Sequence, residues 1–252
     1  MKLAKFWSRD SIEFEGYSQT ARGWSDDSMD AAKAKAREIA QRVVDRLIHH
    51  PGAKEKYPYG DRPLPEPTLR QFAGGMAAVT RNAYGAVILN TDEMMFVDID
   101  SEDRRPPNVD VEAVASRHGL SGRFYKTAAG YRVILTDRTF VPGSPESEAL
   151  LKEFGADVMY VRLCKMQASF RARLTPKPWR CEFYKPPVTY PFESAREESK
   201  FQNWLREYEG NARPYSTCEF VSALGGSVLP EFHELIAYHD EESKAQSGLP
   251  LA

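Results

Sequence analysis

The stretch Met94-Met-Phe-Val-Asp-Ile-Asp100 is a short apolar run that ends in two aspartates two residues apart. Alternate side chains of a strand point to the same face, so Asp98 and Asp100 are expected side by side with Cα atoms about 6.5 Å apart. Two carboxylates at that spacing repel each other unless a proton or a cation lies between them. Hard cations such as Mg²⁺ and Mn²⁺ prefer oxygen ligands, which makes the pair a candidate metal site. The alternative is an ordinary acidic strand end that caps the following turn.

Turn residues divide the surroundings of this stretch into short apolar runs. Asn90-Thr-Asp92 precedes it and Arg81-Asn82 lies further upstream, so three consecutive strands are expected to form an antiparallel meander. Ala128-Ala-Gly130 joins two later runs as in a hairpin, because glycine readily adopts the positive φ of a tight turn. The sequence predicts strands over 2–15 (an edge strand or hairpin), 77–80, 84–89, 94–100, 123–127, 131–136, 158–164 and 170–174.

Helical patterns lie at both ends of the chain and between the strands. Ala36, Ile39, Val43 and Leu47 recur every three or four residues, which predicts a helix over 27–49 with one buried stripe. Two short helices are expected where typical N-cap residues begin a polar-apolar pattern that a glycine ends. These helices begin after Asp110 and Ser144 and end at Gly119 and Gly155.

The tail of the chain carries two capping-box patterns, Ser194-Ala-Arg-Glu197 and Ser216-Thr-Cys-Glu219, and is expected to be mostly helical. Strands and helices in mixed order indicate an α+β fold, with a mixed, largely antiparallel central sheet flanked by helices. We expect a single domain over 1–252, with a functional core at about 75–180 and helical flanks over 25–50 and 194–245.

Composition narrows the class of protein. The formal net charge of the 252-residue chain is -2, so overall charge predicts neither a nucleic-acid binder nor a membrane-surface protein. Three cysteines without metal-ligand spacing favour a reducing compartment over a disulfide framework. No apolar run has the length of a signal peptide or a membrane span, so a cytoplasmic protein without a membrane partner is expected.

One segment departs from this balance of charge. Six cations lie within residues 162–180, and Arg171 and Arg173 share one face of an expected strand. Guanidinium groups bind phosphate with two hydrogen bonds, so an arginine row suits phosphate recognition, and Phe170, Tyr160 and Trp179 can stack bases. The alternative is an arginine row that pairs with acids across the sheet. With the hairpin cations, which can clamp an anion near Gly130, the candidate phosphate-binding residues are Lys126, Arg132, Arg162, Arg171, Arg173 and Lys177.

The order of these motifs resembles the archaeo-eukaryotic primase (primase-polymerase) superfamily. Val97-Asp-Ile-Asp100 is similar to its strand ending in hydrophobic-Asp-hydrophobic-Asp, and Asp157 stands for its third acid, with basic residues downstream. Gly130-Tyr-Arg132 occupies the hairpin position where the family carries a histidine. The resemblance covers about residues 77–180 and implies a primase-polymerase-like core with Asp98, Asp100 and Asp157 as catalytic residues.

Three functions are compatible with these patterns. The first is a metal-dependent nucleotidyl- or phosphoryl-transfer enzyme that acts on nucleotides or nucleic acid, with Mg²⁺ or Mn²⁺ held by Asp98 and Asp100. The second is a catalytically degenerate nucleic-acid or nucleotide-binding module, whose binding falls steeply with salt and needs no divalent metal. The third is a glycosyltransferase with an Asp-x-Asp metal site. The sequence does not predict an oligomeric state.

Overall fold

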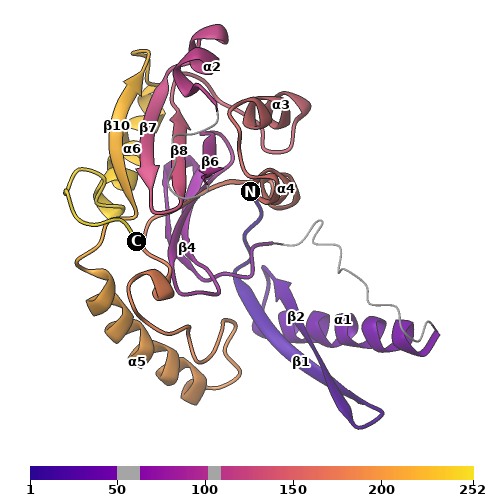
Figure 1. Cartoon of the computed structure of the whole chain (residues 1–252). Helices are drawn as coiled ribbons and strands as arrows, with labels where there is room; N and C mark the ends of the chain where they lie inside the picture. Colours follow the sequence, from indigo (N-terminus) through magenta and orange to yellow (C-terminus); the bar gives the residue numbers. More distant parts are fainter. Residues whose placement is uncertain (50–62, 102–108) are drawn as a thin grey trace.

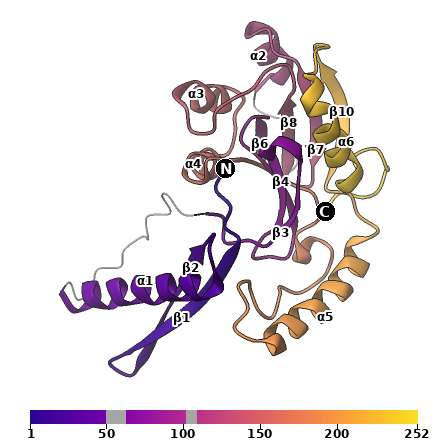
Figure 2. The same ribbon diagram turned by 180° about the vertical axis from the view of Figure 1, so that it is seen from behind.

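A computed structural model describes residues 1–49, 63–101 and 109–252 of the chain. The chain begins with an antiparallel hairpin, β1 (Phe6–Phe14) and β2 (Tyr17–Ser25), followed by α1 (Met29–His49). α1 packs along both strands of the hairpin, and the three elements extend away from the rest of the molecule (Figures 1 and 2). The expected helix over 27–49 and the expected N-terminal hairpin are confirmed within these bounds; residue 50 lies outside the described residues.

The remaining strands form two separate antiparallel sheets of four strands each. The first sheet has the order β3-β4-β5-β9, with β3 (Thr68–Gln71), β4 (Ala77–Arg81), β5 (Val87–Thr91) and β9 (Phe170–Arg173). The second has the order β10-β7-β8-β6, with β10 (Cys218–Leu224), β7 (Gly122–Thr127), β8 (Gly130–Leu135) and β6 (Phe96–Asp100). β6 is therefore an edge strand, and the candidate aspartates lie at its end.

Helices surround the two sheets, which together with them make the expected α+β fold (Figures 1 and 2). The expected single, mixed central sheet is wrong, because the described strands of this part form two separate sheets that are antiparallel throughout. They are α2 (Val111–Arg117), α3 (Pro145–Glu153), α4 (Val158–Gln167), α5 (Ala195–Ala212) and α6 (His233–Glu242). α2, α3 and α5 begin with the side-chain caps that the sequence predicts, from Asp110, Ser144 and Ser194. In the described part of the chain, no helix is both long and apolar enough to cross a membrane.

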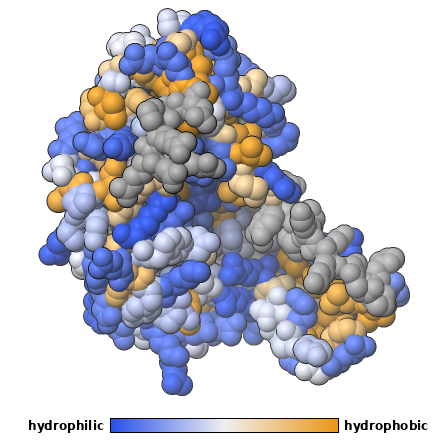
Figure 3. Space-filling model, viewed as in Figure 1, coloured by the Kyte–Doolittle hydropathy of each residue, from blue (hydrophilic) through white to orange (hydrophobic). Residues whose placement is uncertain are grey.

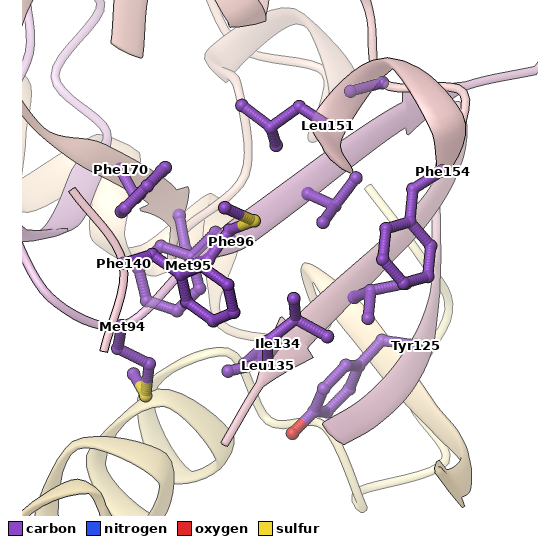
Figure 4. Packing of buried hydrophobic residues seen from close by; sticks show 14 of the residues in the cluster. Met94, Met95, Phe96, Tyr125, Ile134, Leu135, Phe140, Leu151, Phe154 and Phe170 are labelled. Carbon is purple, nitrogen blue, oxygen red and sulfur yellow. The ribbon is translucent and has the colours of Figure 1, made fainter. Parts of the chain in front are cut away.

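The main core lies between the sheets and the helices that cover them. Phe96 at the start of β6 and the preceding Met94 and Met95 enter it from one side. Leu151 near the end of α3 and Phe154, which follows α3, also belong to it (Figure 4). All three cysteines are free and buried. On the face of the molecule seen in Figure 3, apolar residues form scattered patches within a mostly hydrophilic surface.

Three sequence predictions about secondary structure and strand pairing differ from the structure. β4 and β5 pair as expected, but β5 continues to β9 while β6 joins β8 in the other sheet, so the three strands do not form one meander. The expected strand over 158–164 is wrong, because these residues form α4. Tyr160, Val161 and Cys164 are its buried residues, a helical spacing, and the Asp157 side chain caps it.

The expected capping box at Ser216 is also wrong. Its hydroxyl donates to the carbonyl of Leu249 instead of capping a helix, and the following residues form β10. The burial along β10 alternates between Cys218 and Leu224, as expected for a strand with one covered face. The C-terminal flank is therefore two helices with a strand between them.

Candidate functional site

The N-terminus of α4 lies against the free edge of β6. The backbone N–H of Asp157 donates to the carbonyl of Asp98 at 2.9 Å, and the Tyr160 hydroxyl donates to the carbonyl of Phe96 at 2.8 Å. These two carbonyls are two residues apart and point outward from the same strand edge. The Tyr160 hydroxyl also accepts from the backbone N–H of Arg171 at 3.3 Å. α4 thereby joins β6 of one sheet to β9 of the other, and brings Asp157 close to the first aspartate.

The three candidate catalytic acids lie near one another at this edge. Asp98 is half-buried, Asp100 is exposed at the strand end, and Asp157 is half-buried. Partial burial and repulsion from the carboxylates of Asp98 and Asp157 raise the pKa of Asp100 above its usual range. The Oδ1 atom of Asp157 already accepts a hydrogen bond from the backbone N–H of Tyr160. Asp157 is therefore both a helix cap and a negative neighbour of the strand pair.

The acids do not form a closed metal cage. Within the described ranges, no group of three or more histidine, cysteine, aspartate or glutamate residues is arranged to hold a metal ion. Mg²⁺ is usually bound by one or two carboxylates together with substrate phosphates and water. Asp98 and Asp100 fit that mode, because they share a strand face and their repulsion is relieved by a cation between them.

Cations at the end of β9 and in the turn after it lie close enough to these acids to interact with them electrostatically. Burial lowers the pKa of Arg173, and the nearby carboxylate of Asp98 opposes that effect. Partial burial and the neighbouring Arg173 and Arg180 likewise lower the pKa of Lys177, against the attraction of Asp98 and Asp100. The five charged side chains therefore influence one another electrostatically, with acids on β6 and cations on β9 and the turn after it.

Two of these cations have unused hydrogen-bonding capacity. The Nε atom of Arg173 and the Nη1 atom of Arg180 are buried and have no hydrogen-bond partner among the described residues. A buried guanidinium N–H without a partner is unfavourable. An anion placed between these arginines would supply the missing acceptors, and phosphate has the geometry and charge to do so.

The buried side chain of Arg132 contacts this group through the backbone of Arg173. Its cross-strand partner is Asp98, yet the side chain is only 3% exposed. Its Nη1 donates to the backbone carbonyl of Arg173 at 3.1 Å and lies 3.1 Å from Nε2 of His239. Nδ1 of His239 in turn lies 2.9 Å from Oδ1 of Asp240. Arg132 therefore holds β9 against β8, and a phosphate contact from it stays a prediction.

The other predicted phosphate ligands lie elsewhere. Arg171 donates to both carboxylate oxygens of Glu66 at 2.7 Å and to Gln167 at 2.8 Å. Lys126 alternates with Tyr125, the residue opposite Arg132, so it points to the other face of its sheet. Arg162 is exposed on α4, beside a groove of about 260 Å³ between α3 and α4. The structure thus gathers Arg173 and Lys177 at the acids, while Arg171, Lys126 and Arg162 are outside that group.

Arg180 belongs to the group although it is not among the phosphate ligands that the sequence predicts. It follows Lys177 by three residues: Lys177 precedes the short 3₁₀ turn η3 (Pro178–Arg180), and Arg180 is its last residue. Side chains three residues apart lie on one side of such a turn. The proline after Lys177 is the sequence signal that places the two cations together.

The aromatic residues of the segment also separate. Phe170 is fully buried and Tyr160 is 9% exposed, so neither ring is available to stack a base, whereas Trp179 is 45% exposed.

Comparison with known proteins found no protein-family model, curated protein or solved structure that matches this chain. The function is therefore inferred from the residues of the site.

Proposed function

We propose that the protein is a metal-dependent nucleotidyl- or phosphoryl-transfer enzyme that acts on nucleotides or nucleic acid, with a primase-polymerase-like site. Asp98 and Asp100 would hold Mg²⁺ or Mn²⁺ jointly with a substrate phosphate, and Arg173, Lys177 and Arg180 would bind the phosphate charge. The bound cation would neutralise phosphate charge and lower the pKa of an attacking hydroxyl. Asp157 would add negative potential beside the pair while capping α4.

The observation that supports this proposal most strongly is that the acids of β6 and the cations of Arg173 and Arg180 influence one another, while each arginine has a buried nitrogen with no hydrogen-bond partner among the described residues. Acids that already formed close ion pairs with the arginines would leave no room for a ligand. Here the Nε atom of Arg173 has no hydrogen-bond partner in the described residues, although the carboxylate of Asp98 acts on its charge. A metal-bound phosphate satisfies both sides at once, because the cation neutralises the acids and the phosphate oxygens accept from the arginines.

The test is a calorimetric titration of Mn²⁺, and of ATP in the presence of Mn²⁺, into the full chain and the double variant Asp98→Asn with Asp100→Asn. We expect the variant to bind Mn²⁺ at least about tenfold more weakly and to lose metal-dependent ATP binding. Asp110→Asn is the matched control, because it removes one carboxylate at the α2 cap and asparagine caps helices equally well. Binding of both ligands by the double variant at wild-type affinity would contradict the site.

Two observations favour the second candidate, a non-catalytic nucleotide or nucleic-acid binder. Asp157 is engaged by the N–H of Tyr160, and no three-residue metal group exists in the described parts of the chain. Such a module would bind through its cations alone, so its affinity would fall with salt and be the same with and without Mn²⁺. Oligonucleotide binding that is strong in EDTA and unchanged in the double aspartate variant would favour this function over the enzyme.

A further inference from the structure

Trp179 is exposed where the phosphate-binding cations lie. It occupies the middle of η3, between Lys177 and Arg180, and 45% of its surface is open to solvent. Tyr84, from the turn between β4 and β5, meets it edge-on with ring centroids 5.1 Å apart and an interplanar angle of 88°. Tyr84 is itself 44% exposed. The two rings form an exposed aromatic pair, which we call the Trp179–Tyr84 pair.

Cations lie on this pair as well as beside it. The Nζ atoms of Lys177 and Lys185 are 5.7 Å and 5.6 Å from the centroid of the Trp179 ring. Both distances are within the range of cation–π attraction. Lys177 therefore interacts with both the Trp179 ring and the acids, because the carboxylates of Asp98 and Asp100 also influence its charge. A ligand that stacks on Trp179 would have its charged part within reach of the cations of the site.

The covalent connection fixes this proximity. Consecutive Cα atoms are about 3.8 Å apart, so the backbone of Trp179 lies beside that of Arg180. The Lys177 side chain reaches the Trp179 ring, with Nζ 5.7 Å from its centroid. The N–H of Arg180 donates to the carbonyl of Lys177 at 2.8 Å, which closes the turn. Trp179 thus belongs to the same closed turn as the Nη1 atom of Arg180, which has no partner among the described residues.

We propose that the Trp179–Tyr84 pair stacks the nucleobase of a ligand whose phosphates bind Arg173, Lys177 and Arg180. Every nucleobase has a π face, and base stacking on an aromatic side chain tolerates all four bases. The ligand is therefore a base linked to phosphate, rather than a bare phosphate or a sugar phosphate. This inference rests on the proposed function for the phosphate position, and adds the residue that recognises the base.

The two sources of such a ligand, a nucleoside triphosphate and a single-stranded oligonucleotide, are distinguished by titration. ATP, inorganic tripolyphosphate and a single-stranded decanucleotide are each titrated into the full chain, with and without Mn²⁺, and followed by calorimetry. Trp179→Ala is expected to weaken binding of the base-containing ligand by roughly 5- to 150-fold and to leave tripolyphosphate binding unchanged. Trp179→Phe keeps a ring and is expected to retain most of the affinity.

Tyr184→Ala is the matched control, because Tyr184 is another exposed aromatic, at 56%, on the same segment. If ATP alone loses affinity in Trp179→Ala, the stacked base belongs to a mononucleotide; if the oligonucleotide does, it belongs to a strand. Equal affinity of wild type and Trp179→Ala for both ligands would refute the stacking site. An equal loss for tripolyphosphate would refute it too, since the ring would then act on phosphate binding.

Failure of this inference and failure of the proposed function are separable. If Trp179→Ala binds normally while the double aspartate variant loses Mn²⁺-dependent ATP binding, the metal site stands and the base site is wrong. If Trp179→Ala loses binding that the double aspartate variant keeps, the base site stands without the metal function. A wild-type chain that binds neither ATP nor the oligonucleotide would refute both.

Discussion

The backbone N–H of Asp157 donates to the carbonyl of Asp98 across a sequence separation of fifty-nine residues. This hydrogen bond continues the edge of β6 into the cap of α4, so a helix end takes the place of a neighbouring strand. An uncovered edge strand exposes unpaired backbone groups. Covering the edge with a helix N-terminus protects it and brings a third carboxylate to the pair on β6.

Substitution can therefore separate two roles of Asp157, that of a helix cap and that of a negative charge at the site. Asparagine is as good an N-cap as aspartate, whereas alanine is poor. We expect Asp157→Ala to lower the free energy of unfolding by about 0.5–2 kcal/mol and Asp157→Asn to lower it by much less. Urea unfolding measures both, with Ser144→Ala at the α3 cap as the comparison.

The same pair of variants reports on the site. If the charge of Asp157 contributes to metal binding, Asp157→Asn weakens Mn²⁺ binding although its stability is close to wild type. Mn²⁺ affinity equal to wild type in Asp157→Asn would restrict Asp157 to the role of a cap.

Tyr160 joins the two sheets through one hydroxyl group. Its oxygen donates to Phe96 and accepts from Arg171, and the group is buried. Tyr160→Phe leaves the ring in place but removes both bonds, so we expect a loss of about 1–3 kcal/mol in the free energy of unfolding. Tyr184→Phe is the control, because the Tyr184 hydroxyl makes one exposed contact with Glu207 at 3.4 Å. Equal stability of Tyr160→Phe and wild type would show that the hydroxyl does not hold the sheets together.

Local chemistry made the second hairpin predictable. The signals for this hairpin all lie within fifteen residues. They are the two residues between β7 and β8, Gly130, and the alternating pattern of the flanking strands. The run 158–164 was ambiguous, because a short apolar segment fits both a strand and a buried helix face. Its helical state is decided by the Asp157 cap and by packing against β6, and the second of these is a contact between distant residues.

The candidate site also has a part that local sequence predicts and a part that it does not. Asp98 and Asp100 share a face because side chains of a strand alternate with a period of two, and this spacing can be read from the sequence. The partner of Arg171 could not be predicted, because Glu66 lies 105 residues away and no local pattern links them. The different roles of Arg171 and Arg173 are therefore a property of tertiary structure. Arg171 is paired with Glu66, whereas the Nε atom of Arg173 has no partner in the part of the chain that the structure describes.

The Glu66–Arg171 pair is expected to be essential for stability. Both oxygens of Glu66 accept from Arg171, and one also accepts from the buried hydroxyl of Thr80 at 2.5 Å. Removing one partner of a buried ion pair leaves the other charge uncompensated, so Arg171→Met should cost about 3–5 kcal/mol. The double variant with Glu66→Gln should lose less than the sum of the single variants, which a double-mutant cycle in urea measures. Additive losses would show that the two groups do not interact.

The ionisation of Asp240 is expected to make the free energy of unfolding depend on pH in the acid range. Burial alone would raise its pKa, but hydrogen bonds from His239 and Tyr125 and the charge of Arg123 lower the pKa below its usual range. In the unfolded chain the pKa returns to about 3.9, so the unfolded state binds more protons between the two values. The stabilisation is therefore complete above the unfolded pKa and is lost as the pH falls towards the folded pKa. Asp240→Asn removes this contribution, so its free energy of unfolding should fall less than that of wild type from about pH 6 to about pH 3. Parallel pH profiles of the two proteins would exclude this role.

Gly130 allows the second hairpin to approach the aspartate strand. Its φ is +156°, and a Cβ atom there would meet the backbone carbonyl of Ile99 and the N–H of Ser101. Asp100 is its cross-strand partner, so any side chain at position 130 would push the end of β6 away from β8. We expect Gly130→Ala to lower the free energy of unfolding by more than 1 kcal/mol, about the usual cost of overpacking, and to weaken Mn²⁺ binding by displacing Asp100.

The matched control is Gly210→Ala in α5, where a Cβ atom meets nothing within 4 Å. Alanine is favoured over glycine in a helix by about 1 kcal/mol, so this variant should be at least as stable as wild type. In urea unfolding, Gly130→Ala is expected to be less stable than wild type and Gly210→Ala at least as stable. In Mn²⁺ titration, only Gly130→Ala is expected to bind more weakly than wild type. A Gly130→Ala protein with wild-type stability and Mn²⁺ affinity would mean that β6 can move without consequence, and that the position of Asp100 is not fixed by this hairpin.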